Sequence, residues 1–128
     1  MRRLVYIAAV LLFACGGKHQ DYRKAEDALD AGREYINACM QGDFSKAAYY
    51  TLPGGKSRQA LEQIEKTYRE KDKEGRQQFR TASINISEVK NMADSSAEIH
   101  YSNSYDKQPH ILIVVKKNGD WLVDLDNN

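Results

Sequence analysis

The chain has 128 residues, a length that fits one domain. Its 19 basic and 18 acidic residues nearly cancel, which excludes a polybasic nucleic-acid-binding protein and an acidic solvating tail. An apolar fraction of 41% is enough for one small core, and two cysteines are too few for a disulfide scaffold.

The first residues have the organisation of a bacterial secretion signal. Arg2 and Arg3 precede an apolar run from Leu4 to Phe13. This run is too short for a transmembrane helix, which needs roughly 20 residues. We therefore predict a signal peptide over residues 1–14.

The end of the apolar run, Leu12-Phe13-Ala14-Cys15, resembles the lipobox of bacterial lipoproteins. The resemblance implies cleavage after Ala14 and lipid attachment, including palmitate, at Cys15. Because Gly16 follows and no acidic cluster is present, known sorting rules imply the outer membrane, on its periplasmic side. An uncleaved anchor and a soluble secreted protein with a chance cysteine are the alternatives. Residues 15–20 form the lipidated cysteine and tether, and residues 21–128 form the domain.

Apolar residues at spacings of three and four predict three helices at the start of this domain. The first runs from Asp21 to Gln41. Gly42 suits a left-handed carboxy-terminal cap, and Asp43 can cap a short second helix from Phe44 to Tyr50. A third helix is expected from Ser57 to about Lys73, with a charged outer face.

After Gly75 the apolar period changes to two, which predicts four antiparallel strands. The strands are expected at Ala82–Ser87, Ala97–Ser102, Ile111–Val115 and Trp121–Leu125. Asn118-Gly119 is typical of a two-residue hairpin turn. Further turns are expected at residues 91–96 and 106–109.

The alternation also predicts which side chains face the core. These are the apolar residues Ile84, Ile86, Ile99, Ile111 and Val123.

The run from Ile111 to Val115 is apolar on both faces, as a central strand would be. Three short helices cover only one face of a sheet. We therefore expect Leu112 and Val114 to form an exposed homodimer surface.

Helices followed by strands indicate an α+β fold, with three N-terminal helices packed on a curved antiparallel sheet of about four strands. Residues 34–38 and 41–47 resemble the first two helices of nuclear-transport-factor-2-like (cystatin-like) domains, and residues 114–124 resemble their final hairpin. The resemblance spans the mature chain. It is best for small bacterial lipoproteins of unknown function that carry this cone-shaped sheet.

The domain contains a glycine-rich motif and a cysteine that could carry chemistry. Gly54-Gly55-Lys56-Ser57 resembles the end of a phosphate-binding loop, but Tyr50 stands where that loop needs glycine. We expect a loop in which Ser57 caps the next helix. Cys39 lies on the apolar stripe of the first helix and is expected in the core.

The two domain histidines lie on or beside adjacent strands. A turn near Lys107 would pair His100 with residues around 113–114 and keep its ring about 7–10 Å or further from that of His110. No cysteine or carboxylate completes a metal-binding spacing. We predict neither a metal site nor a cofactor.

Tyrosine is the abundant amphipathic residue. Tyr49 and Tyr50 are adjacent, so they cannot both face the core from one helix. Tyrosines cover the open ends of sheets and also line binding grooves. The candidate ligand-binding residues are Tyr49, Tyr50, Tyr101 and Tyr105.

The resemblance also bears on activity, because isomerases and dehydratases of this fold place Asp, His and Tyr inside the cone. The inward positions expected here are apolar, so we predict a non-enzymatic, lipid-anchored periplasmic binding or interaction module. Its partners are the membrane and possibly a second copy through the sheet face, with no nucleic acid. The alternatives are a small isomerase-like enzyme with a pocket in the cone, and a structural envelope protein acting as a homodimer.

Overall fold

The computed structural model describes residues 22–128, so the expected signal peptide, Cys15 and most of the tether lie outside them. Four helices precede four strands in this part of the chain, which confirms the α+β prediction. The helices are α1 (Ala28–Gln41), α2 (Phe44–Tyr49), α3 (Gly55–Glu70) and α4 (Lys73–Thr81). The strands are β1 (Ile84–Ala93), β2 (Ser96–Asn103), β3 (His110–Lys117) and β4 (Asp120–Val123).

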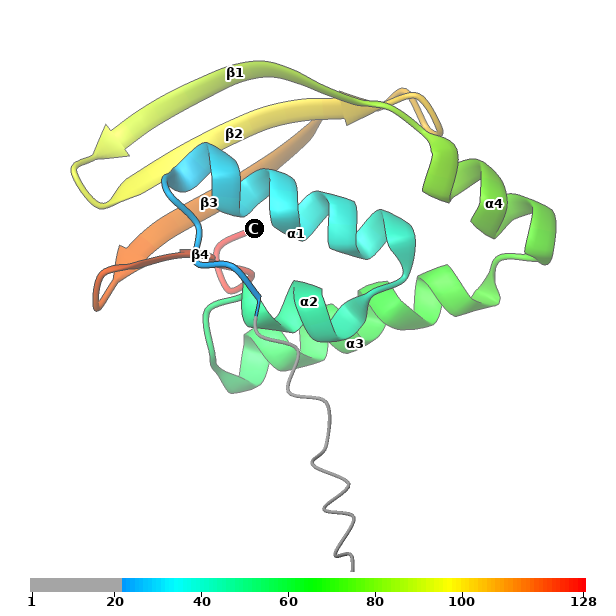
Figure 1. The fold of residues 1–128 in the computed structure, drawn as a ribbon, viewed down its shortest axis with the longest axis horizontal. Helices are drawn as coiled ribbons and strands as arrows, with labels where there is room; N and C mark the ends of the chain where they lie inside the picture. The colour runs from blue at the N-terminus through cyan, green and yellow to red at the C-terminus, as the bar shows by residue number, and fades with distance from the viewer. Residues whose placement is uncertain (1–21) are drawn as a thin grey trace, which may run out of the picture.

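The sheet is an antiparallel meander in the order β1-β2-β3-β4 that curves over α1 (Figure 1). The predicted turn between β3 and β4 is confirmed, since Asn118 and Gly119 both have positive φ, 52° and 82°. On the far edge of β4, residues 50–52 add a short parallel bridge through Thr51 and Val123. This bridge ties the end of α2 to the sheet.

Helix α1 carries the core of the molecule. It begins at Ala28 rather than at Asp21, because Asp27 is its N-cap and accepts a hydrogen bond from the Asp30 amide at 2.8 Å. It ends at Gly42, whose φ of 73° gives the predicted left-handed cap.

The helix lies close to the sheet at Gly32. A Cβ atom added there would be 2.4 Å from Cδ1 of Ile99, so any larger residue would force the Ile99 side chain or α1 to move.

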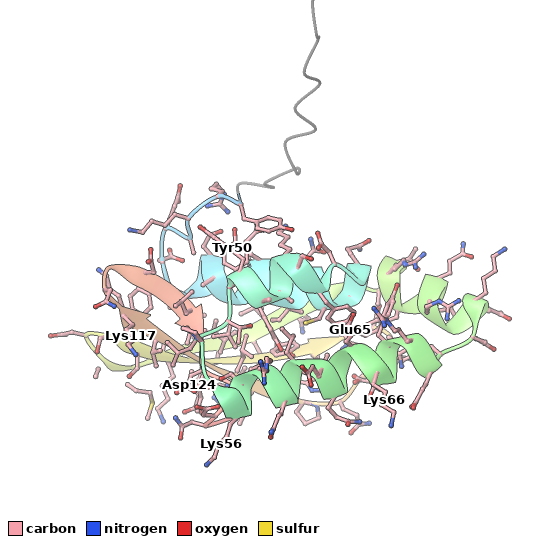
Figure 2. All side chains as sticks on the ribbon, turned by 90° about the horizontal axis from the view of Figure 1, so that it is seen from below. Tyr50, Lys56, Glu65, Lys66, Lys117 and Asp124 are labelled. Carbon is pink, nitrogen blue, oxygen red and sulfur yellow. The ribbon has the colours of Figure 1, made fainter. Side chains whose placement is uncertain are left out.

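The charged residues cover the surface, as Figure 2 shows for Lys56 and Lys66 on α3 and Lys117 at the end of β3. Inside, the fully buried side chains include those of Tyr50, Ile99, Val114 and Val123. The prediction that only one of Tyr49 and Tyr50 faces the core is therefore confirmed, since Tyr49 is exposed.

The prediction of three helices is wrong, because the charged segment after Glu70 folds as a separate helix, α4. Asp72 caps this helix and accepts a hydrogen bond from the Gly75 amide at 2.7 Å. Gly75 therefore lies in the first turn of a helix and does not begin a strand region.

Both ends of the first strand differ from the prediction. The first strand starts at Ile84 rather than Ala82 and runs on to Ala93, past an irregularity at Ser87.

The predicted faces of β3 are reversed. Leu112 and Val114 face α1 and are buried, whereas Ile111 is 53% exposed on the outer face of the sheet. The cross-strand pairs explain this, because Leu112 lies opposite Ile99 and Val114 lies opposite Val123. Leu112 and Val114 therefore cannot form the expected self-association surface, and Ile111 is not a core residue.

The predicted pairing of His100 with residues near 113 is also wrong. His100 lies opposite Ile111, and His110 lies opposite Tyr101. The turn after β2 is centred earlier than expected, because the Asn103 side chain accepts hydrogen bonds from the amides of Tyr105 and Asp106. As a result, His100 and His110 lie on opposite faces of the sheet.

Candidate functional site

A cavity of about 260 Å³ opens where α1, α3, α4 and the β2–β3 turn converge. The inner end of this pocket is formed by Cys39 of α1. Its sides come from α3 and α4, and its rim from the turn. The residues that carry the argument below are Cys39, Ile64, Tyr68, Lys71, Phe79 and Tyr105.

A chain of aromatic rings lines this pocket. The ring of Tyr68 contacts those of Phe44 and Phe79, with centroids 5.6 and 6.2 Å away. Phe79 in turn meets Tyr105 edge to face at 5.2 Å. Aromatic rings in these arrangements offer a broad apolar surface for a flat or aliphatic group.

A cation lies at the rim of the same pocket. The Lys71 Nζ atom is 5.3 Å from the Phe79 ring centroid and 4.8 Å from that of Tyr105, close enough for cation–π attraction. Arg80 adds a second positive group nearby, since its Nε donates a hydrogen bond to the Tyr68 hydroxyl at 2.6 Å. Asp106 also lines the pocket, so its surroundings carry two cations, Lys71 and Arg80, against one carboxylate. This excess of positive charge favours an anionic group.

The ionisable groups at and near the inner end of the pocket are uncharged at neutral pH. Burial raises the pKa of the Cys39 thiol to about 11, and the Tyr35 hydroxyl only partly offsets that effect. Burial also raises the pKa of Tyr35, and it raises that of Tyr101 to about 12. All three groups are neutral near pH 7, and Cys39, a free buried thiol, is a core residue as predicted.

One polar cluster reaches the pocket through Asp106, which lines it. The Asp106 carboxylate lies 2.8 Å from His110 Nε2, and the His110 ring stacks on Tyr101 with centroids 5.1 Å apart. Burial alone would raise the pKa of Asp106, but hydrogen bonds from the Gln108 amide and the His110 ring outweigh it and lower that pKa. The expectation of apolar inward positions missed this cluster, because it counted isoleucine and valine only.

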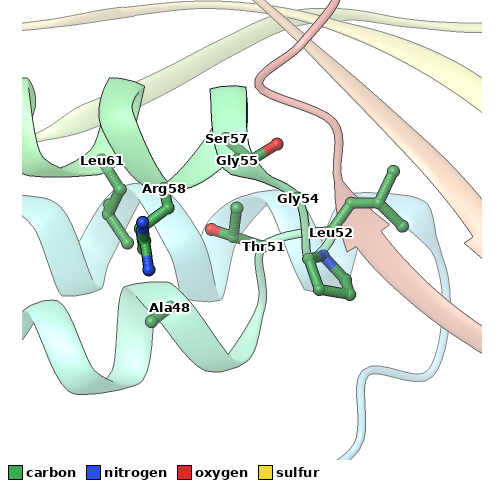
Figure 3. A pocket seen from close by; sticks show the side chains of 9 residues that line it. Ala48, Thr51, Leu52, Gly54, Gly55, Ser57, Arg58 and Leu61 are labelled. Carbon is green, nitrogen blue, oxygen red and sulfur yellow. The ribbon is translucent and has the colours of Figure 1, made fainter.

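A second cavity, of about 430 Å³, is an open groove between α2 and the start of α3. Figure 3 shows Leu52 and Leu61 at its two ends, with Ala48 and the Arg58 side chain between them. Ser57 is not the helix cap expected from the sequence. It lies inside α3, is buried, and donates a hydrogen bond to the Asp126 carboxylate at 3.0 Å.

The four candidate tyrosines fall into separate places. Tyr49 and Tyr50 meet edge to face at 4.9 Å beneath α1, where Tyr50 is buried and its hydroxyl donates a hydrogen bond to the Arg23 carbonyl. Tyr101 is half-buried behind the pocket, and Tyr105 is on its rim.

The pocket residues that the sequence reasoning missed are Tyr68, Lys71 and Phe79. Tyr68 was expected on the apolar face of the third helix and Lys71 on its charged outer face, without a role in a site. Phe79 lies in α4, which was not predicted, and it is the only large apolar residue of that helix.

Two further properties concern residues 22–128 alone. Within them, no cluster of three or more His, Cys, Asp or Glu side chains is arranged to hold a metal ion. None of the helices in that part of the chain combines the length and apolar character needed to cross a membrane.

The fold is of the nuclear-transport-factor-2-like class, with helices packed into a curved antiparallel sheet. A similar solved structure is that of an NTF-2-like protein of unknown function from Shewanella oneidensis MR-1. It matches with a TM-score of 0.52 and 13% sequence identity, over 74% of this chain and 89% of the other. No protein-family model and no curated protein matches the sequence. At this identity the likeness supports the fold.

Proposed function

We propose that this protein is a lipid-anchored periplasmic binding module, without enzymatic activity, that holds an amphipathic anion in the pocket between α1, α3 and α4. The observation that carries the proposal is the combination of an aromatic wall and a cation at one rim. A ligand with an apolar or aromatic body would contact Tyr68 and Phe79. Its acidic group would lie beside Lys71, at the outer end of the pocket.

The size of the pocket limits the ligand. Small-molecule sites are usually about 300–1,000 Å³, and this cavity of about 260 Å³ is just below that range. A compact aromatic acid or the end of an aliphatic chain therefore fits better than a large cofactor.

The second candidate function is a small isomerase-like enzyme. The cluster of Asp106, His110 and Tyr101 favours it, because carboxylate–imidazole pairs serve general acid–base chemistry. We rank it second because the Asp106 carboxylate, although it lines the pocket, is already engaged by the His110 ring and the Gln108 amide. The Cys39 thiol at the inner end of the pocket and the Tyr101 hydroxyl are neutral near pH 7.

The binding proposal can be tested with the aromatic anion 8-anilinonaphthalene-1-sulfonate. Ile64→Trp fills the pocket from α3 and should abolish enhancement of the dye's fluorescence. Leu61→Trp, one turn earlier on the same helix, fills the other groove and serves as the matched control. Lys71→Met should weaken binding about tenfold, which corresponds to about 1.4 kcal/mol. Equal dye binding by the two tryptophan variants would contradict the proposal.

The anchor is tested separately at Cys15. In cells, Cys15→Ser should remove incorporation of labelled palmitate and shift the protein out of the detergent phase. Three acyl chains would hold the protein firmly at a bilayer, whereas one binds only marginally. Palmitate labelling that survives the substitution would refute the anchor.

A further inference from the structure

The point at which the chain enters the folded part is held in place by side chains. The ring of Tyr22, the first described residue, lies 5.3 Å from that of Tyr49 in α2. The hydroxyl of the buried Tyr50, which is labelled in Figure 2, donates a hydrogen bond to the Arg23 carbonyl. The Arg23 guanidinium binds the Asp30 carboxylate in α1 at 2.6 Å. The first described residues, Tyr22 and Arg23, are therefore held beside α2.

The proposed anchor lies close to this place in sequence. Six residues separate Cys15 from Tyr22. Because an extended chain spans at most about 3.6 Å per residue, Cys15 lies within about 25 Å of Tyr22. The inference below rests on the proposed function in this one respect, because the lipid on Cys15 holds α2 near the bilayer.

The surface beside this point is apolar and aromatic. Tyr49 is 44% exposed, Pro53 is exposed and Leu52 is half-buried. The groove of about 430 Å³ shown in Figure 3 opens between α2 and α3, and it is lined by Leu52 and Pro53. Tyrosine is enriched at membrane–water interfaces, where its ring is apolar and its hydroxyl stays wet.

Two of the cations beside this surface, Lys24 and Arg58, have acidic partners. Lys24 Nζ lies 3.3 Å from an Asp120 carboxylate oxygen, and Arg58 lies 3.9 Å from Glu62. Lys56 at the start of α3 is exposed and has no acidic partner among the described residues, but one lysine adds only about 1 kcal/mol of attraction to anionic lipids. Contact would then come from inserted apolar groups and would be insensitive to salt.

We propose that the α2 face, defined as Tyr22, Tyr49, Leu52 and Pro53, lies in the headgroup region of a zwitterionic phospholipid bilayer. The anchor brings the face to the membrane, and the face sets the orientation of the protein. Cys39, at the inner end of the binding pocket, is near the carboxy-terminal end of α1, whereas Tyr50 is tied to Arg23 before its amino-terminal end. The inner end of the pocket and the point where the chain enters the fold therefore lie at opposite ends of α1.

Tryptophan quenching by brominated lipid tests this orientation in the full-length lipidated protein. Trp121 is the sole tryptophan, so Trp121→Phe gives a silent background. In that background, Tyr49→Trp reports on the α2 face, and Ile111→Trp reports on the outer face of the sheet as a matched exposed control. In vesicles of brominated phosphatidylcholine, we expect fluorescence at position 49 to fall at least twofold and fluorescence at position 111 to be unchanged. Pro53→Trp is a second reporter should Tyr49→Trp fold poorly.

The outcomes separate this proposal from that of the anchor. Co-flotation with vesicles measures the anchor, and its absence overturns both. Flotation without quenching at positions 49 and 53, or with equal quenching at position 111, overturns the orientation alone. Quenching that disappears in 1 M salt also overturns it. A further outcome is that brominated lipid does not quench the fluorescence of a tryptophan at position 49, while acrylamide cannot reach that tryptophan in intact envelopes. In that case a protein covers the α2 face and the proposal is wrong.

Discussion

Gly32 offers a sharp test of how α1 packs on the sheet. In an exposed helix interior, Gly→Ala stabilises by about 1 kcal/mol. At Gly32 the new methyl group would be 2.4 Å from Cδ1 of the fully buried Ile99 and 3.6 Å from Leu112. Overpacking of a core costs about 1–3 kcal/mol. Because this cost exceeds the helix gain, Gly32→Ala should lower the free energy of unfolding by about 1 kcal/mol.

Ile99→Val removes Cδ1, the atom that the new methyl group at position 32 would meet, and completes a double-mutant cycle. Ile99→Val alone should lower the free energy of unfolding by about 1 kcal/mol. Together with Gly32→Ala it should restore nearly wild-type stability, a coupling of about 2 kcal/mol. Urea denaturation of residues 22–128 measures each step. Gly55→Ala is the control, because nothing lies within 4 Å of a Cβ there, and it should cause no loss. Additive effects at positions 32 and 99, or a stabilising Gly32→Ala, would refute the close approach.

Three further predictions concern the sheet and α1. Replacing both Leu112 and Val114 by Thr should lower the free energy of unfolding by more than about 3 kcal/mol, because both side chains are buried. Ile111→Thr, on the exposed face, should change it by less than about 0.5 kcal/mol. Urea denaturation measures both values. Hydrogen bonding from Arg23, although opposed by burial, lowers the pKa of Asp30 from 3.8 to about 2. That stabilisation is present above pH 4 and is lost as pH falls toward 2, and Asp30→Asn should remove this part of the acid dependence. If two copies associate through the outer face of the sheet, sedimentation should show a dimer that Ile111→Lys converts to monomer, and a monomeric wild type at high micromolar concentration would exclude it.

Local signals predicted the elements best. Gly42 and the pair Asn118-Gly119 adopt the left-handed conformations expected of them, because that backbone preference does not depend on tertiary context. Helix α4 was missed because Gly75 was read as a break, although Asp72 three residues earlier is a standard N-cap.

The faces of β3 were not predictable from its own residues. From Ile111 to Val115 every side chain is apolar, so alternation carries no information about which face is buried. The register in which β3 pairs with β2 decides which face of β3 is buried. That register is set in the turn by Asn103, whose side chain accepts two backbone hydrogen bonds.

The same turn connects the fold to the candidate site. By holding the amides of Tyr105 and Asp106, Asn103 places the Tyr105 ring at the rim beside Phe79. It also places Asp106 within reach of His110. The rim of the binding pocket and the carboxylate–imidazole pair of the alternative enzyme therefore depend on one buried side chain. A single change at Asn103 would perturb both, so it cannot separate binding from catalysis. Substitutions on α3, which touch the pocket and not the pair, are the ones that can.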